Sequence, residues 1–341
     1  MNNDSIHFKQ IHLGFSILKS LLAFNVIISH CFRINTTKNR IILFICKRRR
    51  FHVPSFVILS FYFNHNTLIS TDTKKKLNRF ERLIIPYLGW PIIIFLFSNI
   101  IKYFKKFSIL CSFKILIFQL ITGQGNLVFH FWYLFDLILT TFIFHLIIII
   151  FRKRYLFILN LLLLFSYFIQ YSKYSKMLYY YTNKLAGLAR ENEIMPFAIT
   201  GFTLSSLKVL NICEKFKINS FLICLIIYNL LQDYEIFANL FGVAYSGIKL
   251  NVISICVIII FSLFPLNNKP KNIIKILKYI TNYSGGIFYL HQVIHFYFKY
   301  ILLDIQRGTF IGVIMIYFIS YFICILGTSI FKTTKAKNLF S

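Results

Sequence analysis

Lys19 and His30 are the two ionisable side chains of an otherwise apolar stretch, KSLLAFNVIISH. Eleven steps of about 100° make about three helical turns, so both side chains lie on one helix face, about 16 Å apart along the axis. Ala23 and Val26 fill that face between them. An ionisable group inside a membrane helix usually faces the protein interior or a cavity. The pair therefore indicates an interior site, although a snorkelling lysine and a chance histidine at the helix end would give the same pattern.

A second group of cations lies in KKKLNRFERLIIPY, which begins at Lys74. Lys75, Arg79 and Arg82 are spaced i, i+4 and i+7, so they share one face of a helix. The planar fork of arginine binds phosphate oxygens in pairs. This face could therefore bind a phosphorylated ligand at the membrane surface, and the alternative is a solvated flank that touches lipid headgroups.

Further polar residues lie near two later apolar runs. His130 and Asp136 are candidates for the protein interior, and a carboxylate at membrane depth should have a partner. Trp132 at the start of a span is more typical of an aromatic belt than of a substrate platform. His291 and His295 are spaced i and i+4, but no third ligand is evident, so we expect packing or hydrogen bonding there and no metal site.

The composition indicates which elements must position these groups. The chain of 341 residues is 57% hydrophobic with a mean hydropathy of +0.69, and 14% of its residues are charged, where soluble domains carry about 25%. Apolar runs of membrane-spanning length recur along the whole chain. We therefore expect an all-α integral membrane protein with about ten transmembrane helices in a single bundle, formed by one domain over residues 1–341.

The ten expected spans lie near 13–32, 51–70, 83–101, 127–150, 154–172, 192–209, 218–233, 249–266, 278–301 and 308–331. Residues 102–126 mix apolar side chains with lysines, which favours an interfacial helix. Pro86 and Pro91 predict a kink or an unwound turn in the third span.

The net charge of +28 makes the loops basic, so they should attract anionic lipid headgroups or anionic ligands. The Lys and Arg residues are scattered between the apolar spans and form no separate basic domain, which argues against nucleic-acid binding. The seven cysteines form no C-x-x-C pair and are expected to be buried hydrophobes. Charge does not orient the chain, because the adjacent loops at 33–50 and 71–82 are both strongly basic.

Four ordered stretches resemble the acyltransferase 3 family of multi-spanning membrane enzymes. KSLLAFNVIISH resembles the family's first-helix motif, a basic residue followed after ten positions by histidine. HVPSFVILSFYF with KKKLNRFERLIIPYLGW resembles its second span, R-x-x-R loop and third span. HFWYLFDLI resembles a later span start, and MPFAITGFTL and YSGGIFYLHQVI resemble segments further along. The resemblance covers most of the chain.

The resemblance implies transfer of an acyl group, most often acetyl from acetyl-CoA, to sugars of surface polysaccharides, lipopolysaccharides and related glycans. The partners would be acyl-CoA as donor substrate, a glycan or lipid-linked glycan as acceptor, and membrane lipids, with no bound cofactor. The protein would lie in the plasma or inner membrane with both termini cytosolic. That topology places the KRRR run of residues 47–50 outside, against the charge rule.

Acyl transfer to a hydroxyl needs a base, and His30 is the best one because a neutral imidazole can accept a proton near pH 7. In this interpretation Arg79 and Arg82 hold the CoA phosphates, and Lys19 guides the donor. Direct transfer and transfer through an acylated protein both remain open. The residues that could orient His30 or line the pocket are His130, Trp132, Asp136 and His291.

Two residues depart from the family's pattern. The first-helix cation is often arginine, and Lys19 keeps the charge without the bidentate fork. The second span usually carries Ser-Gly where this chain has Ser60 and Phe61, so a bulky ring replaces a residue that lets helices approach closely. A carrier or flippase for a glycan, lipid or small solute is the alternative function, and a scaffold that has lost its chemistry is a third. The absence of an internal sequence repeat favours the enzyme over the carrier.

Overall fold

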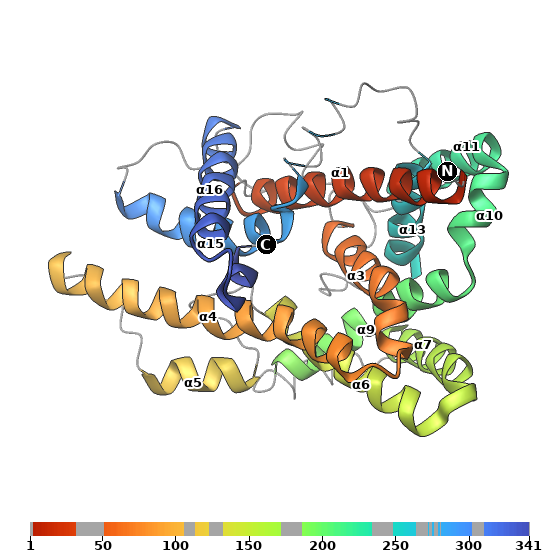
Figure 1. The fold of residues 1–341 in the computed structure, drawn as a ribbon, viewed down its shortest axis with the longest axis horizontal. Coiled ribbons are helices and arrows are strands. Elements are labelled where there is room, and N and C mark those ends of the chain that lie inside the picture. The colour runs from red at the N-terminus through yellow and green to blue at the C-terminus, as the bar shows by residue number, and fades with distance from the viewer. Residues whose placement is uncertain are drawn as a thin grey trace.

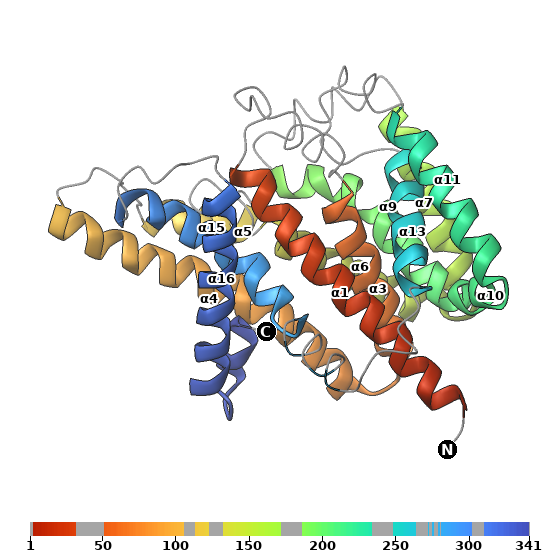
Figure 2. The ribbon, with the colours of Figure 1, turned by 90° about the horizontal axis from the view of Figure 1, so that it is seen from above.

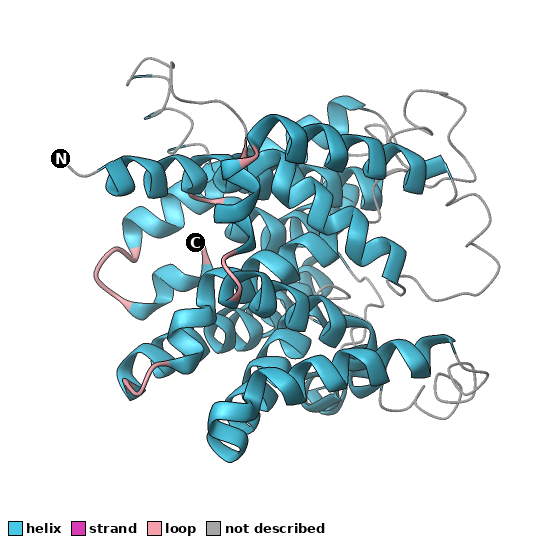
Figure 3. Ribbon diagram, turned by 90° about the vertical axis from the view of Figure 1, so that its right-hand side faces the viewer, coloured by secondary structure: helices cyan, strands magenta, loops and turns pink. Residues whose placement is uncertain are grey.

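A computed structural model describes residues 3–31, 51–105, 113–122, 132–171, 186–233, 248–263, 272, 275, 279, 281–301 and 310–340. In these residues every regular element is a helix and there is no strand (Figure 3). The expected all-α class is therefore confirmed for the part of the chain that is described. The KRRR run and His130 lie outside the described residues.

The helices are labelled in Figure 1. Their bounds are α1 (Asn3–Cys31), α3 (His52–Ile69), α4 (Thr73–Lys105), α5 (Phe113–Thr122), α6 (Trp132–Phe151), η2 (Arg152–Arg154), α7 (Tyr155–Tyr171), α9 (Ala186–Ser206), α10 (Val209–Lys215), α11 (Lys217–Asp233), α13 (Ile248–Ser262), α15 (Ser284–Ile301), α16 (Phe310–Ile330) and η5 (Lys335–Leu339). Each of the ten stretches expected to span the membrane overlaps one of these helices, because a long apolar run satisfies its backbone groups most simply as a helix.

Only some of these helices are long and apolar enough by themselves to cross a membrane. In the described residues two stretches qualify, Trp132–Gln170 and Ile311–Ile330, and the pair Glu193–Ser206 and Val209–Lys215, bent by 60°, adds a third if it is one span. Three shorter apolar helices lie at Gly14–Ile28, Lys217–Leu231 and Ile248–Ser262. The apolar helices fit a membrane protein, and the count of ten spans stays a prediction.

The first of these stretches is longer than one span needs. Its 39 residues would extend about 58 Å as a straight helix, while the hydrocarbon core is about 30 Å thick. Arg152 has φ 42°, the left-handed region, and it begins the short helix η2. This turn separates α6 from α7, which pack against each other, as the two separate runs in the sequence predict.

The centre of the molecule is built by helices that pack closely around α3. In Figure 2, α1, α3 and α13 lie next to one another, and α9 packs against α3. A Cβ atom on Gly201 of α9 would collide with the backbone carbonyl of Ile58 on α3. Gly201 therefore allows α9 and α3 to approach closely. Close approach matters in a membrane because helix association there depends on van der Waals packing.

The helix α4 carries the two prolines that predict a kink or an unwound turn. It continues through Pro86 and Pro91 as one helix of 33 residues, so the unwound turn is wrong. The short helix α5 lies in the stretch where we expect an interfacial helix, and it packs on α4 and α9. Phe113 and Ile121 of α5 are 63% and 70% exposed, which fits contact with lipid.

Candidate active site

A cavity of about 940 Å³ opens where α4 meets α1, α3, α6, α15, α16 and η5. Five cationic side chains line it: Lys19, Lys75, Arg79, Arg82 and Lys337. None of the described residues that line it is acidic. Cations collected in one place repel one another, and this repulsion is relieved when an anion binds among them. We call this site the cation cavity.

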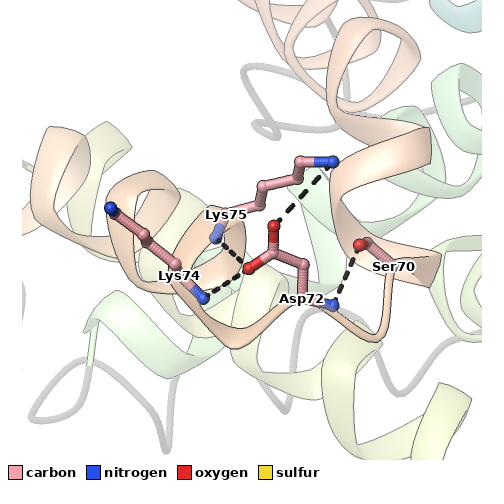
Figure 4. A network of polar contacts seen from close by, with 4 residues as sticks. All are labelled: Ser70, Asp72, Lys74 and Lys75. Carbon is pink, nitrogen blue, oxygen red and sulfur yellow. Dashed lines mark hydrogen bonds and ion pairs between the residues drawn. The ribbon is translucent and has the colours of Figure 1, made fainter.

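The cationic face of α4 begins at a fixed point because Asp72 caps the helix (Figure 4). The Asp72 carboxylate accepts hydrogen bonds from the backbone N–H groups of Lys74 at 2.9 Å and Lys75 at 3.3 Å. The Asp72 N–H in turn donates to the Ser70 hydroxyl at 3.0 Å. Such a cap satisfies donors that the first helical turn leaves unpaired. It therefore fixes the register in which the later cations of α4 face the cavity, and their shared face is confirmed.

Arg79 is a half-buried cation of α4 that lines the cavity. Its Nη2 donates a hydrogen bond of 2.6 Å to the hydroxyl of Ser60 on α3, and it interacts electrostatically with Tyr133 and Tyr289. Burial lowers the pKa of the Arg79 guanidinium to about 10, so the group stays charged at neutral pH. Arg79 is therefore held at a defined position in the cavity wall, with further N–H groups left to bind an anion.

Lys19 reaches the cavity from α1. Its Nζ lies 4.8 Å from the centroid of the Phe63 ring, a cation–π distance, and it interacts electrostatically with Arg79. Ala23 and Val26, which continue the face of Lys19, are buried. The prediction that this face of α1 points into the protein is confirmed, and Lys19 does not snorkel away from it.

His30 lies at the other end of this face, in the last turn of α1, and is half-buried. Its ring centroid is 5.5 Å from that of His291 on α15, and the rings are inclined by 32°. His291 is fully buried, and its Nδ1 lies 3.3 Å from the carbonyl oxygen of Ile287. A carbonyl only accepts hydrogen bonds, so this contact is a hydrogen bond when Nδ1 of His291 carries the proton. We call His30 and His291 the histidine pair.

Phe288 connects the cation cavity to the histidine pair. It lines the cavity, and its ring centroid lies 6.0 Å from that of His291. Phe56 and Tyr133 pack on the same ring, at 5.2 Å and 5.1 Å between centroids. The aromatic cluster of Phe56, Tyr133 and Phe288 therefore lines the cavity, and through Phe288 it also contacts His291.

The remaining residues that the sequence singled out have different surroundings. Asp136 is fully buried and interacts electrostatically with Tyr87 of α4. Trp132 is 8% exposed and lies edge-on to Tyr133 at 6.2 Å, so its ring is enclosed by protein. His30 has His291 as one of its neighbours. The proposal that Asp136 or His130 orients His30 stays untested.

Phe61 replaces the small residue of the family's pattern without opening the core. It is fully buried, and its ring lies 4.8 Å from that of Phe144 on α6. Phe144 in turn lies 5.3 Å from Phe202 of α9. The neighbouring Ser60 still reaches Arg79. Phe61 therefore packs against α6, and it does not line the cation cavity.

Several site residues were not singled out from the sequence. Ser60, Tyr133 and Tyr289 lie within stretches that carry the family resemblance, so their neighbourhood was indicated but their contacts were not. Lys337 lies in a short basic segment whose lysines are unevenly spaced, so the sequence did not place it at the site. Among the described residues, no group of three or more His, Cys, Asp or Glu side chains could hold a metal ion.

Comparison with known proteins bears on the chemistry of this site. A family model described as an acyltransferase domain matches residues 12–331, nearly the whole chain. No curated protein and no solved structure matches it. The matched range contains both histidines and every cation of the cavity except Lys337.

Proposed function

Because this chain belongs to the acyltransferase 3 family and is a membrane acyltransferase, we propose that it moves an acyl group, most simply acetyl, from acyl-CoA to a glycan hydroxyl. The observation that carries the proposal is the cation cavity joined through Phe288 to the histidine pair. One site can hold the phosphates of a donor and the other can move a proton.

The donor would bind with its phosphates in the cation cavity. CoA carries a pyrophosphate and a 3′-phosphate, and Arg79 and Arg82 present forks that suit phosphate oxygens. Lys19 adds charge on the side from which α1 leads to His30. The pantetheine arm would pass over the aromatic cluster of Phe56 and Phe288 and bring the thioester to the histidine pair. On this path Lys19 would guide the donor.

In the chemical step, His30 would take the proton from the acceptor hydroxyl as its oxygen attacks the thioester carbonyl. The tetrahedral intermediate collapses when the C–S bond breaks, and the imidazolium of His30 returns the proton to the CoA thiolate. The products are an ester on the glycan and free CoA. His291 would orient the His30 ring, because the two rings are in contact and His291 is held by Ile287.

The proposed orientation of the protein in the membrane is based on the side on which the donor, acyl-CoA, is available. Acyl-CoA is found in the cytosol, so the cation cavity would face the cytosol and α1 would carry the site towards the far side of the plasma or inner membrane. The termini would then be cytosolic. A glycan or lipid-linked glycan would reach the histidine pair from the membrane or from its far side.

The deciding experiment supplies radiolabelled acetyl-CoA to membranes that hold this protein, with membranes that hold a His30→Ala variant as the control. We expect label on a glycan in the first sample and none in the second. Label that reaches no glycan, together with passage of an intact solute across the membrane, would instead identify a carrier. Equal labelling by both samples would remove His30 from the mechanism.

A further inference from the structure

The segment 331–340 follows α16 and forms one wall of the cation cavity. It contains η5, and Figure 1 shows it in dark blue between α16 and α4, both of which it contacts. Lys337 and Asn338 of this segment line the cavity together with Thr328 of α16. The family match ends at residue 331, so residues 332–340 of this wall lie outside the part of the chain that the match covers.

Several contacts hold the segment against α4. The indole Nε1–H of Trp90 donates to the carbonyl of Leu339 at 3.0 Å. Lys335 pairs with Glu81 at 2.5 Å, and a Cβ atom on Gly89 would lie 2.5 Å from Leu339 Cδ2. The acceptor of this hydrogen bond is the backbone carbonyl of Leu339. The contact therefore fixes the main chain two residues after Lys337.

Phe340 anchors the same segment against α15 and α16. It is 9% exposed, and its ring stacks on Phe331 at 5.9 Å and lies edge-on to Trp90 at 5.6 Å. A Cβ atom on Gly286 or Gly327 would collide with Phe340. The segment is therefore seated in a space that glycines leave for it, and it is part of the packed structure.

We propose that this segment is a wall of the donor site and that Lys337 binds a phosphate of acyl-CoA there. The proposal rests on the proposed function for the identity of the anion. Lys337 is exposed to the cavity, and the anchors on both sides of it present its ammonium to the same space as Arg79 and Arg82. Asp and Glu are absent from the described lining, so an incoming phosphate would meet cations from α1, α4 and this segment.

The test measures the equilibrium binding of radiolabelled CoA to the purified full chain and to a Lys337→Gln variant. We expect about tenfold weaker binding, since one charge-assisted hydrogen bond is lost, and Lys337→Arg should restore the affinity. Lys332→Gln is the matched control, because Lys332 is exposed in the same segment and does not line the cavity.

A second variant tests the wall by another route. Phe340→Ala removes the ring that seats the segment, and it should weaken CoA binding although it replaces no cationic side chain. Equal affinity of Lys337→Gln and the unaltered chain would overturn the proposal, as would an equal loss in Lys332→Gln. If the unaltered chain binds no CoA, the proposed function itself fails, which is a different result from a chain that binds CoA without regard to Lys337.

Discussion

The cation cavity and the histidine pair differ in how they meet water. The cavity is open, and Arg82 and Lys337 are exposed to it. In the histidine pair, His291 is fully buried and contacts His30, which is half-buried. The exposed cations Arg82 and Lys337 keep much of their solvation in the first region, while the second offers an enclosed place for proton transfer. The difference indicates a division between binding of the donor and chemistry.

This division has a kinetic consequence. A residue that holds the donor equally in the ground state and in the transition state changes KM, and a residue that acts only in the transition state changes kcat. Variants of the cavity should therefore act on KM for acyl-CoA, and variants of the histidine pair should act on kcat. A cavity variant that changes kcat alone, or a variant of the histidine pair that changes KM for acyl-CoA alone, would contradict this division.

The largest effect is expected from His30→Ala. Loss of a general base should lower kcat by about a hundredfold to ten-thousandfold, while equilibrium binding of CoA stays unchanged because His30 is not part of the cavity. The measurement is acyl transfer from labelled acetyl-CoA, together with CoA binding by the same preparation. His145→Ala is the control, since His145 lies on α6 and does not line the cavity. Weakened CoA binding in His30→Ala would contradict the division.

The next effect is expected from Arg79→Ala. Loss of charge-assisted hydrogen bonds worth about 1.5–3 kcal/mol should raise KM for acyl-CoA by about ten- to a hundredfold, with kcat little changed. Arg79→Lys should recover part of the loss, because lysine keeps the charge without the fork. The control is Lys74→Ala, which removes an exposed cation of α4 outside the cavity. An unchanged KM in Arg79→Ala would remove the phosphate role.

His30 and Arg79 also show how much of the site can be predicted from the sequence. The helices follow from apolar runs, and the shared face of Arg79 and Arg82 follows from spacing along one helix. The contact of His30 with His291 joins residues far apart in the chain, and no local period encodes it. The same is true of Lys337, which η5 brings to α4. Spacing within an element is readable, whereas the meeting of elements depends on packing that the sequence does not display.

A smaller effect is expected from His291→Ala, which separates orientation from chemistry within the histidine pair. Loss of a ring contact worth about 0.5–1.5 kcal/mol should lower kcat by up to about tenfold, with KM for acyl-CoA unchanged. The measurement is the ratio of kcat in His291→Ala to kcat in the unaltered chain and in His30→Ala. A loss as large as that of His30→Ala would contradict a purely orienting role for His291.

The smallest effect is expected from Ser60→Ala, and it tests whether the cavity is preorganised. The Ser60 hydroxyl accepts a hydrogen bond of 2.6 Å from Arg79, and its loss should cost about 0.5–1.5 kcal/mol. Arg79 keeps its charge but loses its fixed position, so KM for acyl-CoA should rise about fivefold while kcat stays the same. Ser55→Ala is the matched control, because Ser55 lies on the same helix and does not line the cavity. If Ser60→Ala has no effect in an Arg79→Ala background but raises KM alone, the serine acts through the arginine. Equal effects in both backgrounds would mean that Ser60 contacts the donor directly.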